Sequence, residues 1–397
     1  MNNYQAVLLS LLKSSLFDVP ISLSDSIDWS DLFQEAVNQT VVGLVAPKVK
    51  EWAQKRNVSN IDHWVSKSDQ LNAYFVYCFQ MQRELINLYE DNGIPIVIVK
   101  GYAAAVNYPT PQRRTMGDID FLVMKDRFED AKALMEKAGY KQEGGEVHED
   151  DRHIGFVKNN VSFEMHRTFG SFGLDIDSAI EYGIKTPSVG TIADIKFPVL
   201  PPLGNGLVLI AHIRQHLLDE NHSLGLRQII DWMMYVNKYS GRIMETGCSW
   251  DESFLTLAES YRLDTLAITV TYICSKMLGL PNAPGWCDKA DKETAEELLD
   301  LIMISGNFGS KREYNNTSVK SGLVLYKHDG ILKRLQNRGL VNWKASQKYP
   351  ILRPFAWMYQ GVRVMRLGIA GIVSNNHGFK QICEGNKKGN LLKKLGI

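Results

Sequence analysis

Two aspartates at the start of an apolar segment are the first residues in this chain that could do chemistry. Asp118 and Asp120 lie in "GDIDFLV", residues 117–123, where Ile119 and Phe121 alternate with them. Side chains alternate between the two faces of a strand, so both carboxylates are expected on one face and the apolar residues in the core. Like charges that close repel unless a cation offsets them, and a divalent ion with oxygen ligands would do so. Gly117 would let a ligand approach the backbone closely.

A third carboxylate lies in "VSFEMH", residues 161–166, where Glu164 shares the polar face with Ser162 and His166. If this strand pairs beside the first, three carboxylates converge, as in sites that hold two Mg²⁺ ions for displacement at phosphorus. His166 has two open interpretations, a contribution to the metal or base function and a structural role.

A strand that ends in "VKGYAAAV" places Lys100 and Gly101 at a strand-to-helix turn. Free backbone N–H groups at such a turn favour phosphate, and lysine binds anions readily. Arg114, or Arg113 in its place, would neutralise the aspartates or contact phosphate. The chain has no G-x-x-x-x-G-K-[ST] sequence, which argues against a P-loop NTPase.

The surrounding pattern predicts an α+β protein with a small mixed β-sheet between two helical regions. Residues 1–92 show helical spacing of apolar residues, and Asp28 or Ser30 is available as an N-cap. Residues 93–202 contain the short strands and an amphipathic helix that is closed by a glycine. After Pro201 and Pro202, residues 203–397 return to a helical pattern.

Composition limits the remaining possibilities. The net charge is +1, and the five cysteines are scattered without a C-x-x-C pair, which argues against a disulfide framework and a zinc knuckle. No apolar run reaches the roughly 18–20 residues of a membrane span. These features favour a cytoplasmic protein.

Whole-chain neutrality conceals a basic C-terminal region. Residues 331–397 contain thirteen Lys or Arg against one acid, Glu384. A solvated surface, a nucleic-acid contact and a helix at a membrane surface all fit this pattern, and the sequence leaves the choice open.

The arrangement of these elements resembles a known superfamily. A strand with a glycine turn, a G-D-x-D strand, a helix and a strand with a third acid are the signature of the DNA-polymerase-β-like nucleotidyltransferases. Three segments are similar to an uncharacterised bacterial family found near polysaccharide-biosynthesis genes: "IPIVIVKGYAAAVNYPTPQRRTMGDIDFLV", "VSFEMH" and "HLLDENHSLGLRQIIDWMMYV". The likeness covers most of positions 27–240.

This resemblance implies a nucleotidyltransferase core in residues 93–202. It implies that Asp118, Asp120 and Glu164 are catalytic and hold Mg²⁺ or Mn²⁺, with Glu164 also able to activate the attacking hydroxyl. Lys100, Gly101, Arg114 and Gly117 would contact the nucleoside triphosphate. The implied reaction moves NMP from an NTP to an acceptor hydroxyl on a small molecule, a saccharide or RNA and releases pyrophosphate.

Two alternatives to this enzyme stay open. Tyr102 stands where the superfamily usually has serine in the phosphate turn, which would suit a non-catalytic nucleotide-binding or regulatory protein on the same fold. The basic C-terminal region would suit a toxin-like enzyme that modifies tRNA. Farther along the chain, His212 and His216 share a helix face, and Arg227 and Asp231 form an i, i+4 pair that could line the cleft.

Overall fold

The structure is a computed structural model of the whole 397-residue chain. It describes residues 1–21, 27–56, 58, 61–143, 152–170, 172–219, 223–311, 335–336, 339–340, 343, 345–346, 349–363, 366 and 387–397. About half of the basic C-terminal region, residues 331–397, lies outside these residues, and the contacts predicted for that region stay untested.

The chain divides into two compact units. The first consists of Met1–Ser310 with Leu395–Ile397, and the second is Lys311–Lys394. The predicted boundaries near residues 92 and 202 both fall inside the first unit, where they coincide with transitions between helices and strands. Whether the three predicted regions are separate domains stays a prediction.

Four helices precede the sheet: α1 (Asn3–Phe17), α2 (Trp29–Asn38), α3 (Val42–Arg56) and α4 (Asp62–Asp91). The side chain of Asp28 accepts hydrogen bonds from the first-turn N–H groups of Ser30 and Asp31, so Asp28 is the N-cap of α2. The carboxylate thereby satisfies backbone donors that have no partner within the helix.

Among the described residues of the first unit, the strands form one seven-stranded mixed sheet in the order β3-β4-β5-β2-β1-β7-β6. Its strands are β1 (Ile96–Val99), β2 (Ile119–Val123), β3 (Lys141–Gln142), β4 (His153–Lys158), β5 (Val161–His166), β6 (Ser188–Ile192) and β7 (Ile195–Val199). Strand β2 pairs antiparallel with β1 and parallel with β5. The β4–β5 turn uses Asn159 and Asn160 with positive φ angles of 53° and 59°, a conformation that asparagine tolerates well.

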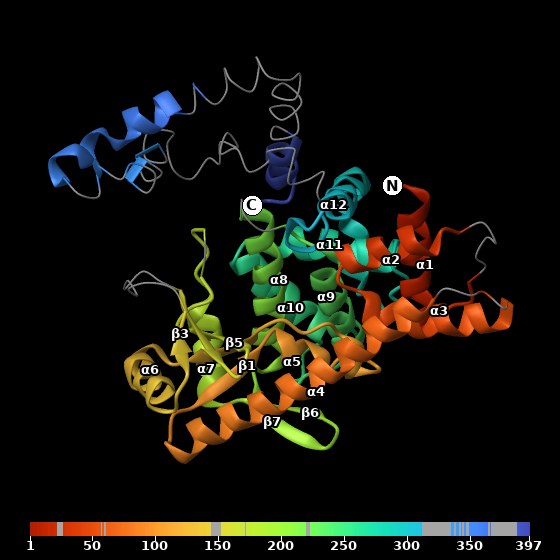
Figure 1. Cartoon of the computed structure of the whole chain (residues 1–397), viewed down its shortest axis with the longest axis horizontal. Helices are drawn as coiled ribbons and strands as arrows, with labels where there is room; N and C mark the ends of the chain where they lie inside the picture. The colour runs from red at the N-terminus through yellow and green to blue at the C-terminus, as the bar shows by residue number, and fades with distance from the viewer. Residues whose placement is uncertain are drawn as a thin grey trace. The chain divides into compact units, whose positions relative to one another are not determined.

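Strand alternation gives the sheet one apolar face. Ile119, Phe121 and Val123 of β2 join Val161, Phe163 and Met165 of β5 in one buried cluster, together with side chains of α4 and of α6 (Phe128–Lys137). Figure 1 shows α4 running along the sheet. The intervening residues of β2 and β5, among them Asp120 and Glu164, therefore face the other side.

Helices also follow the sheet in the first unit. They are α8 (Pro202–Leu218), α9 (Leu226–Tyr239), α10 (Trp250–Ser260), α11 (Asp264–Lys276) and α12 (Lys292–Ser305). Shorter elements of the first unit are α5 (Gly101–Ala105) and α7 (Asp177–Lys185), with the 3₁₀ helices η1 (Pro111–Arg113), η2 (Lys125–Arg127), η3 (Gly285–Lys289) and η4 (Asn307–Gly309). The 3₁₀ helix η5 (Pro350–Phe355) belongs to the second unit. Among the described residues, no helix combines the length and the apolar character that crossing a membrane requires.

The predicted α+β class is confirmed, with a mixed sheet and helical regions on both sides of it in the chain. The sheet has more strands than the sequence pattern indicated, because β3 and the β6–β7 hairpin extend its two edges. Strand β3 has only two residues, too few to show an alternating pattern.

Candidate active site

Two acids lie opposite each other on neighbouring strands. The parallel pairing of β2 with β5 sets Asp120 against Glu164, and Phe121 against Met165 in the apolar face. The register thus places both carboxylates on the same face of the sheet. Asp120 is buried at 3% exposure, whereas the Glu164 side chain is partly open to solvent.

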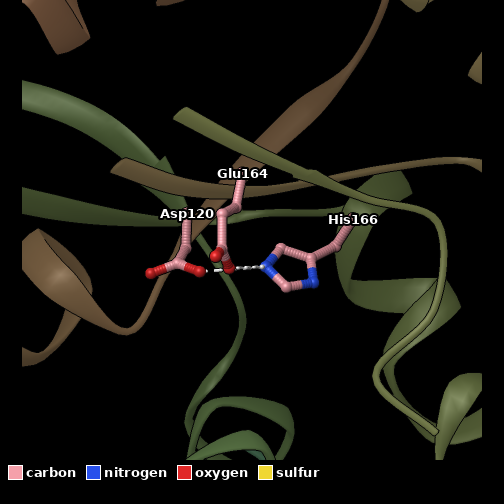
Figure 2. A group of neighbouring side chains, drawn as sticks. All are labelled: Asp120, Glu164 and His166. Atoms are coloured by element: carbon pink, nitrogen blue, oxygen red, sulfur yellow. Dashed lines mark hydrogen bonds and ion pairs between the residues drawn. The ribbon is translucent and has the colours of Figure 1, made fainter. Parts of the chain in front are cut away.

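The imidazole of His166 completes the cluster. Its Nε2 lies 2.9 Å from Asp120 Oδ1 and 3.3 Å from Glu164 Oε2. Figure 2 shows the two carboxylates and the ring pointing toward a common point. One ligand atom from each of the three residues lies within 4.8 Å of the others.

Lys100 brings a positive charge to the same point. Its Nζ forms an ion pair with Asp120 Oδ1 and lies 3.7 Å from Glu164 Oε2. Lys100 follows β1 directly and has a φ of 52°, which is unusual for a residue with a side chain and costs of order 1–3 kcal/mol. The turn holds this conformation at the place where the ammonium reaches both acids.

Burial and charge shift the protonation of the cluster in different directions. Burial raises the pKa of Asp120 to about 6, although the Lys100 charge opposes the shift. Burial also disfavours ionisation of Glu164, but the His166 hydrogen bond and Lys100 outweigh it and lower the pKa of Glu164. Burial lowers the pKa of His166, and its hydrogen bonds to Asp120 and Glu164 outweigh that effect and raise it.

Asp118 lies just before β2 and is half-buried. Its negative charge contributes to raising the pKa of Asp120, so it is part of the same electrostatic environment. The preceding residue, Gly117, is exposed. Gly101 packs against this segment, since an added Cβ would lie 3.2 Å from Met116 Cε and 3.6 Å from the Asp118 carbonyl oxygen.

Tyr102 points away from the cluster and into the apolar core. Its hydroxyl donates a 2.7 Å hydrogen bond to the Phe75 carbonyl oxygen of α4, and its ring packs on Phe75 and Phe79. The side chain of Tyr102 therefore lies in the apolar core, so its presence after Gly101 is no argument against catalysis.

Arg114 has a partner within the protein. Its Nε and Nη2 each donate a 2.7 Å hydrogen bond to Asp231 of α9, and the Tyr108 hydroxyl donates to the same carboxylate. Arg114 and Asp231 are both about 5% exposed. The predicted contact between Arg114 and phosphate stays untested, and the structure gives its guanidinium a positioning role between the turn before β2 and helix α9.

Arg227 of α9 brings a second guanidinium to the turn. Its Nη1 donates to the Thr115 carbonyl oxygen at 3.5 Å and would lie 3.9 Å from a Cβ added at Gly117. His212 of α8 is near enough for the charges of Lys100 and Arg227 to act on it. Arg227, which the sequence suggested as a cleft-lining residue, thus reaches the region beside Gly117, and His212 lies within electrostatic range of Lys100.

Two aromatic side chains beside the cluster, Phe169 and His153, were not predicted from the sequence. Phe169 stacks on His166 at 5.0 Å between centroids and lies under the Lys100 ammonium at 5.5 Å. His153 Nε2 lies 3.7 Å from Glu164 Oε1, because β4 pairs His153 with His166. A signal was available for His166, which shares a strand face with Glu164, whereas Phe169 follows β5 in an irregular segment.

The donor set fits a divalent cation. Two carboxylates offer oxygen ligands, and an imidazole adds a nitrogen, on neighbouring strands whose backbone is fixed by the sheet. The Lys100 ammonium offsets part of the negative charge of the two carboxylates, which shows that the cluster binds a positive group.

Comparisons with known proteins give a family and several distantly similar solved structures. Residues 25–279, more than half of the chain, match a family described as uncharacterised nucleotidyltransferase. A comparison with curated proteins found no match. A crystal structure of ANT(2″)-Ia in complex with adenylyl-2″-tobramycin is similar at 13% identity and a TM-score of 0.33, covering 46% of this chain and 95% of that one.

A solution structure of the antibiotic-resistance factor ANT(2″)-Ia is similar at 12% identity and a TM-score of 0.35, over 49% of this chain and 95% of that one. The family match contains the sheet and every residue of the cluster. The chain belongs to this uncharacterised nucleotidyltransferase family and is an enzyme, a transferase of phosphorus-containing groups.

Proposed function

We propose that the protein transfers NMP from a nucleoside triphosphate to an acceptor hydroxyl, with divalent-cation dependence and release of pyrophosphate. The observation that carries the proposal is the register that sets Asp120 against Glu164 beside Lys100. The family match supports the same reaction class.

In the proposed reaction, the hydroxyl oxygen forms a bond to the α-phosphorus. The bond from that phosphorus to the α–β bridging oxygen breaks, and pyrophosphate leaves with the electron pair. A bound Mg²⁺ or Mn²⁺ would lower the pKa of the hydroxyl and stabilise charge on the phosphates.

The residues of the chain have separate proposed roles. Asp118, Asp120 and Glu164 hold the cation, and Glu164, the more accessible of the two opposed acids, accepts the hydroxyl proton and passes it to water. Lys100 and the turn residues Gly101 and Gly117 contact the triphosphate. Arg114 keeps that turn in place through Asp231.

The acceptor class is a finer proposal. A saccharide hydroxyl is favoured by the family resemblance, and RNA is the second candidate because the C-terminal region is basic. The described cysteines Cys78, Cys248, Cys274 and Cys287 have free thiols, which supports a cytoplasmic location for the reaction.

A transfer assay tests the proposal. Full-length protein is incubated with each α-labelled NTP, Mg²⁺ or Mn²⁺, and either RNA or a panel of saccharides, while pyrophosphate release and label transfer are followed. We expect Asp118→Asn, Asp120→Asn and Glu164→Gln each to lower kcat at least about 100-fold, because each removes charge that holds the cation.

The matched control is Glu181→Gln, which neutralises an exposed carboxylate of α7 that pairs with Lys185. This variant is expected to retain wild-type turnover. Pyrophosphate release that is unchanged in Asp120→Asn and Glu164→Gln, with both variants folded by circular dichroism, would remove the catalytic assignment.

A further inference from the structure

We infer that His166 is a metal ligand, so that the cation site is a mixed oxygen and nitrogen site with a preference for Mn²⁺ over Mg²⁺. The inference deepens the proposed function and rests on its divalent-cation dependence. It assigns to His166 the metal contribution that the sequence left open, beside the acids Asp118, Asp120 and Glu164.

Distances within the cluster match those between ligands of one ion. Two ligands bound at right angles at roughly 2.1 Å from a metal lie about 3.0 Å apart. The His166 Nε2 is 2.9 Å from Asp120 Oδ1 and 3.3 Å from Glu164 Oε2. The His166 nitrogen therefore already has the spacing of a neighbouring coordination position from each of the two carboxylate oxygens, and the three donor atoms all lie within 4.8 Å of one another.

The ring is held in this orientation by its surroundings. The side chain of His166 is 7% exposed, Phe169 stacks on one side, and His153 lies 5.1 Å away between centroids. Strand pairing fixes the backbone on both sides, because β5 lies between β2 and β4. Little side-chain freedom is left to lose when a metal binds, which favours coordination.

The position between the donors already attracts a cation. The Lys100 ammonium pairs with Asp120 Oδ1, the same oxygen that contacts His166, and lies 3.7 Å from Glu164 Oε2. A divalent ion between the three donors would replace this monovalent charge at Asp120 and release Lys100 toward an anionic ligand.

The nitrogen donor changes the expected selectivity. Mg²⁺ prefers oxygen ligands, whereas imidazole suits transition-metal ions, and the affinity of such a site for divalent first-row metals generally rises from Mn²⁺ to Cu²⁺, with Zn²⁺ below Cu²⁺. A site of carboxylates alone would lack this bias.

Pulsed EPR of Mn²⁺ added to the full-length protein without nucleotide tests the inference. A coordinated imidazole nitrogen gives ¹⁴N modulation of the Mn²⁺ echo. We expect this signal in the wild type, its loss in His166→Gln, and a rise of at least tenfold in the Mn²⁺ dissociation constant. His166→Glu, which restores an oxygen ligand, is expected to lower the ratio of Mn²⁺ to Mg²⁺ affinity.

His153→Gln is the matched control, because His153 contacts the same glutamate from the next strand. It should keep both the ¹⁴N modulation and the wild-type affinity. Absence of Mn²⁺ binding, absence of modulation in the wild type, or its loss in His153→Gln would overturn the inference. If His166→Gln does not fold, the wild-type and His153→Gln spectra still decide.

The outcome is separable from that of the transfer assay. Turnover without ¹⁴N modulation would leave the proposed function in place and remove His166 from the ligand set. Suppose instead that the modulation depends on His166 but the protein transfers no nucleotide with any NTP and acceptor tried. That result would keep His166 as a metal ligand and remove the proposed function.

Discussion

The carboxylate of Asp120 is the most constrained charge in the candidate site. It is almost fully buried, and its Oδ1 contacts both the Lys100 ammonium and the His166 ring. A buried carboxylate without such partners would cost several kcal/mol, so the partners determine whether the folded chain tolerates it. The stability of the folded chain and the chemistry of Asp120 therefore depend on the same two neighbours, Lys100 and His166.

Replacing Lys100 by methionine should destabilise the fold. The substitution removes the ammonium and keeps most of the apolar stem, leaving Asp120 with less compensation. We expect the free energy of unfolding in metal-free buffer to fall by about 3 kcal/mol, measured by urea denaturation. The Lys100→Met/Asp120→Asn double variant should lose less than the sum of the single changes.

Lys185→Met provides the control for lost surface charge. Lys185 pairs with Glu181 at 3.1 Å, but both side chains are more than half exposed. Its replacement is expected to cost less than about 1 kcal/mol. An equal fall in the free energy of unfolding for the two lysine variants would show that the buried ion pair stabilises the fold no more than the exposed pair does.

His212 gives a pH dependence of known sign. Burial first, and then electrostatic interactions with His216, Lys100 and Arg227, lower its pKa well below the usual value, with Glu164 opposing. The folded state thus binds fewer protons than the unfolded state at acidic pH. The free energy of unfolding should fall as pH drops below about 6.5, by up to about 1.4 kcal/mol per pH unit from this group.

Urea denaturation between pH 5 and pH 8 checks this effect. His212→Gln should lose less stability on acidification than the wild type, while His63→Gln, at an exposed position of α4, should follow the wild type. A constant difference between wild type and His212→Gln over this range would contradict the assignment.

At the scale of elements, helix α9 and the turn before β2 are joined by one buried ion pair. Arg114 and Asp231 are 117 residues apart in the chain, and their two 2.7 Å bonds form a fork that a lysine could not reproduce. Tyr108, which follows α5, donates to the same carboxylate at 2.7 Å. The segment after α5, the turn before β2 and helix α9 are thereby held together by one carboxylate.

Breaking this ion pair on one side should be costly. We expect Asp231→Ala to lower the free energy of unfolding by about 3–5 kcal/mol, because Arg114 keeps its buried charge without a counterion. Tyr108→Phe should cost about 1 kcal/mol. Arg114→Met/Asp231→Leu should be less destabilising than the summed single variants, as measured in a double-mutant cycle.

The exposed pair of Arg127 with Asp130 is the matched control, and Asp130→Ala is expected to change stability by less than about 1 kcal/mol. If Asp231→Ala lowered the free energy of unfolding by as little, the Arg114–Asp231 ion pair would not be what fixes α9 against the turn before β2.

For the whole molecule, the candidate site lies within one compact unit. The cluster, the family match to residues 25–279 and all seven strands belong to Met1–Ser310. From the second unit the chain continues to Leu395, which is fully buried and belongs to the first unit. The last residues thus contribute to the stability of the first unit.

A chain that ends at Ser310 should fold and bind Mn²⁺ with nearly the wild-type dissociation constant. It should be less stable by at least about 2 kcal/mol, the contribution expected from burying one leucine. Circular dichroism in urea and Mn²⁺ titration measure both quantities. Leu395→Ala in the full chain isolates the leucine, and loss of Mn²⁺ binding in the short chain alone would show that the second unit is needed for the site.

The sequence by itself determined strands β2 and β5 and the faces of their side chains. Alternation along "DIDFLV" and "VSFEMH" is a property of consecutive residues, so it predicted that Asp120 and Glu164 lie opposite the apolar face. The helix start at Asp28 is equally local, since the capping side chain bonds to the N–H groups two and three residues later.

Only the tertiary structure decided which of these groups meet. The register of β2 against β5 places His166 next to the acids, and long-range packing sends Tyr102 into the core and gives Arg114 to Asp231. Such contacts depend on how distant segments pack together, because burial and pairing energies are set by the whole core. A residue's own neighbours in the chain carry little information about them.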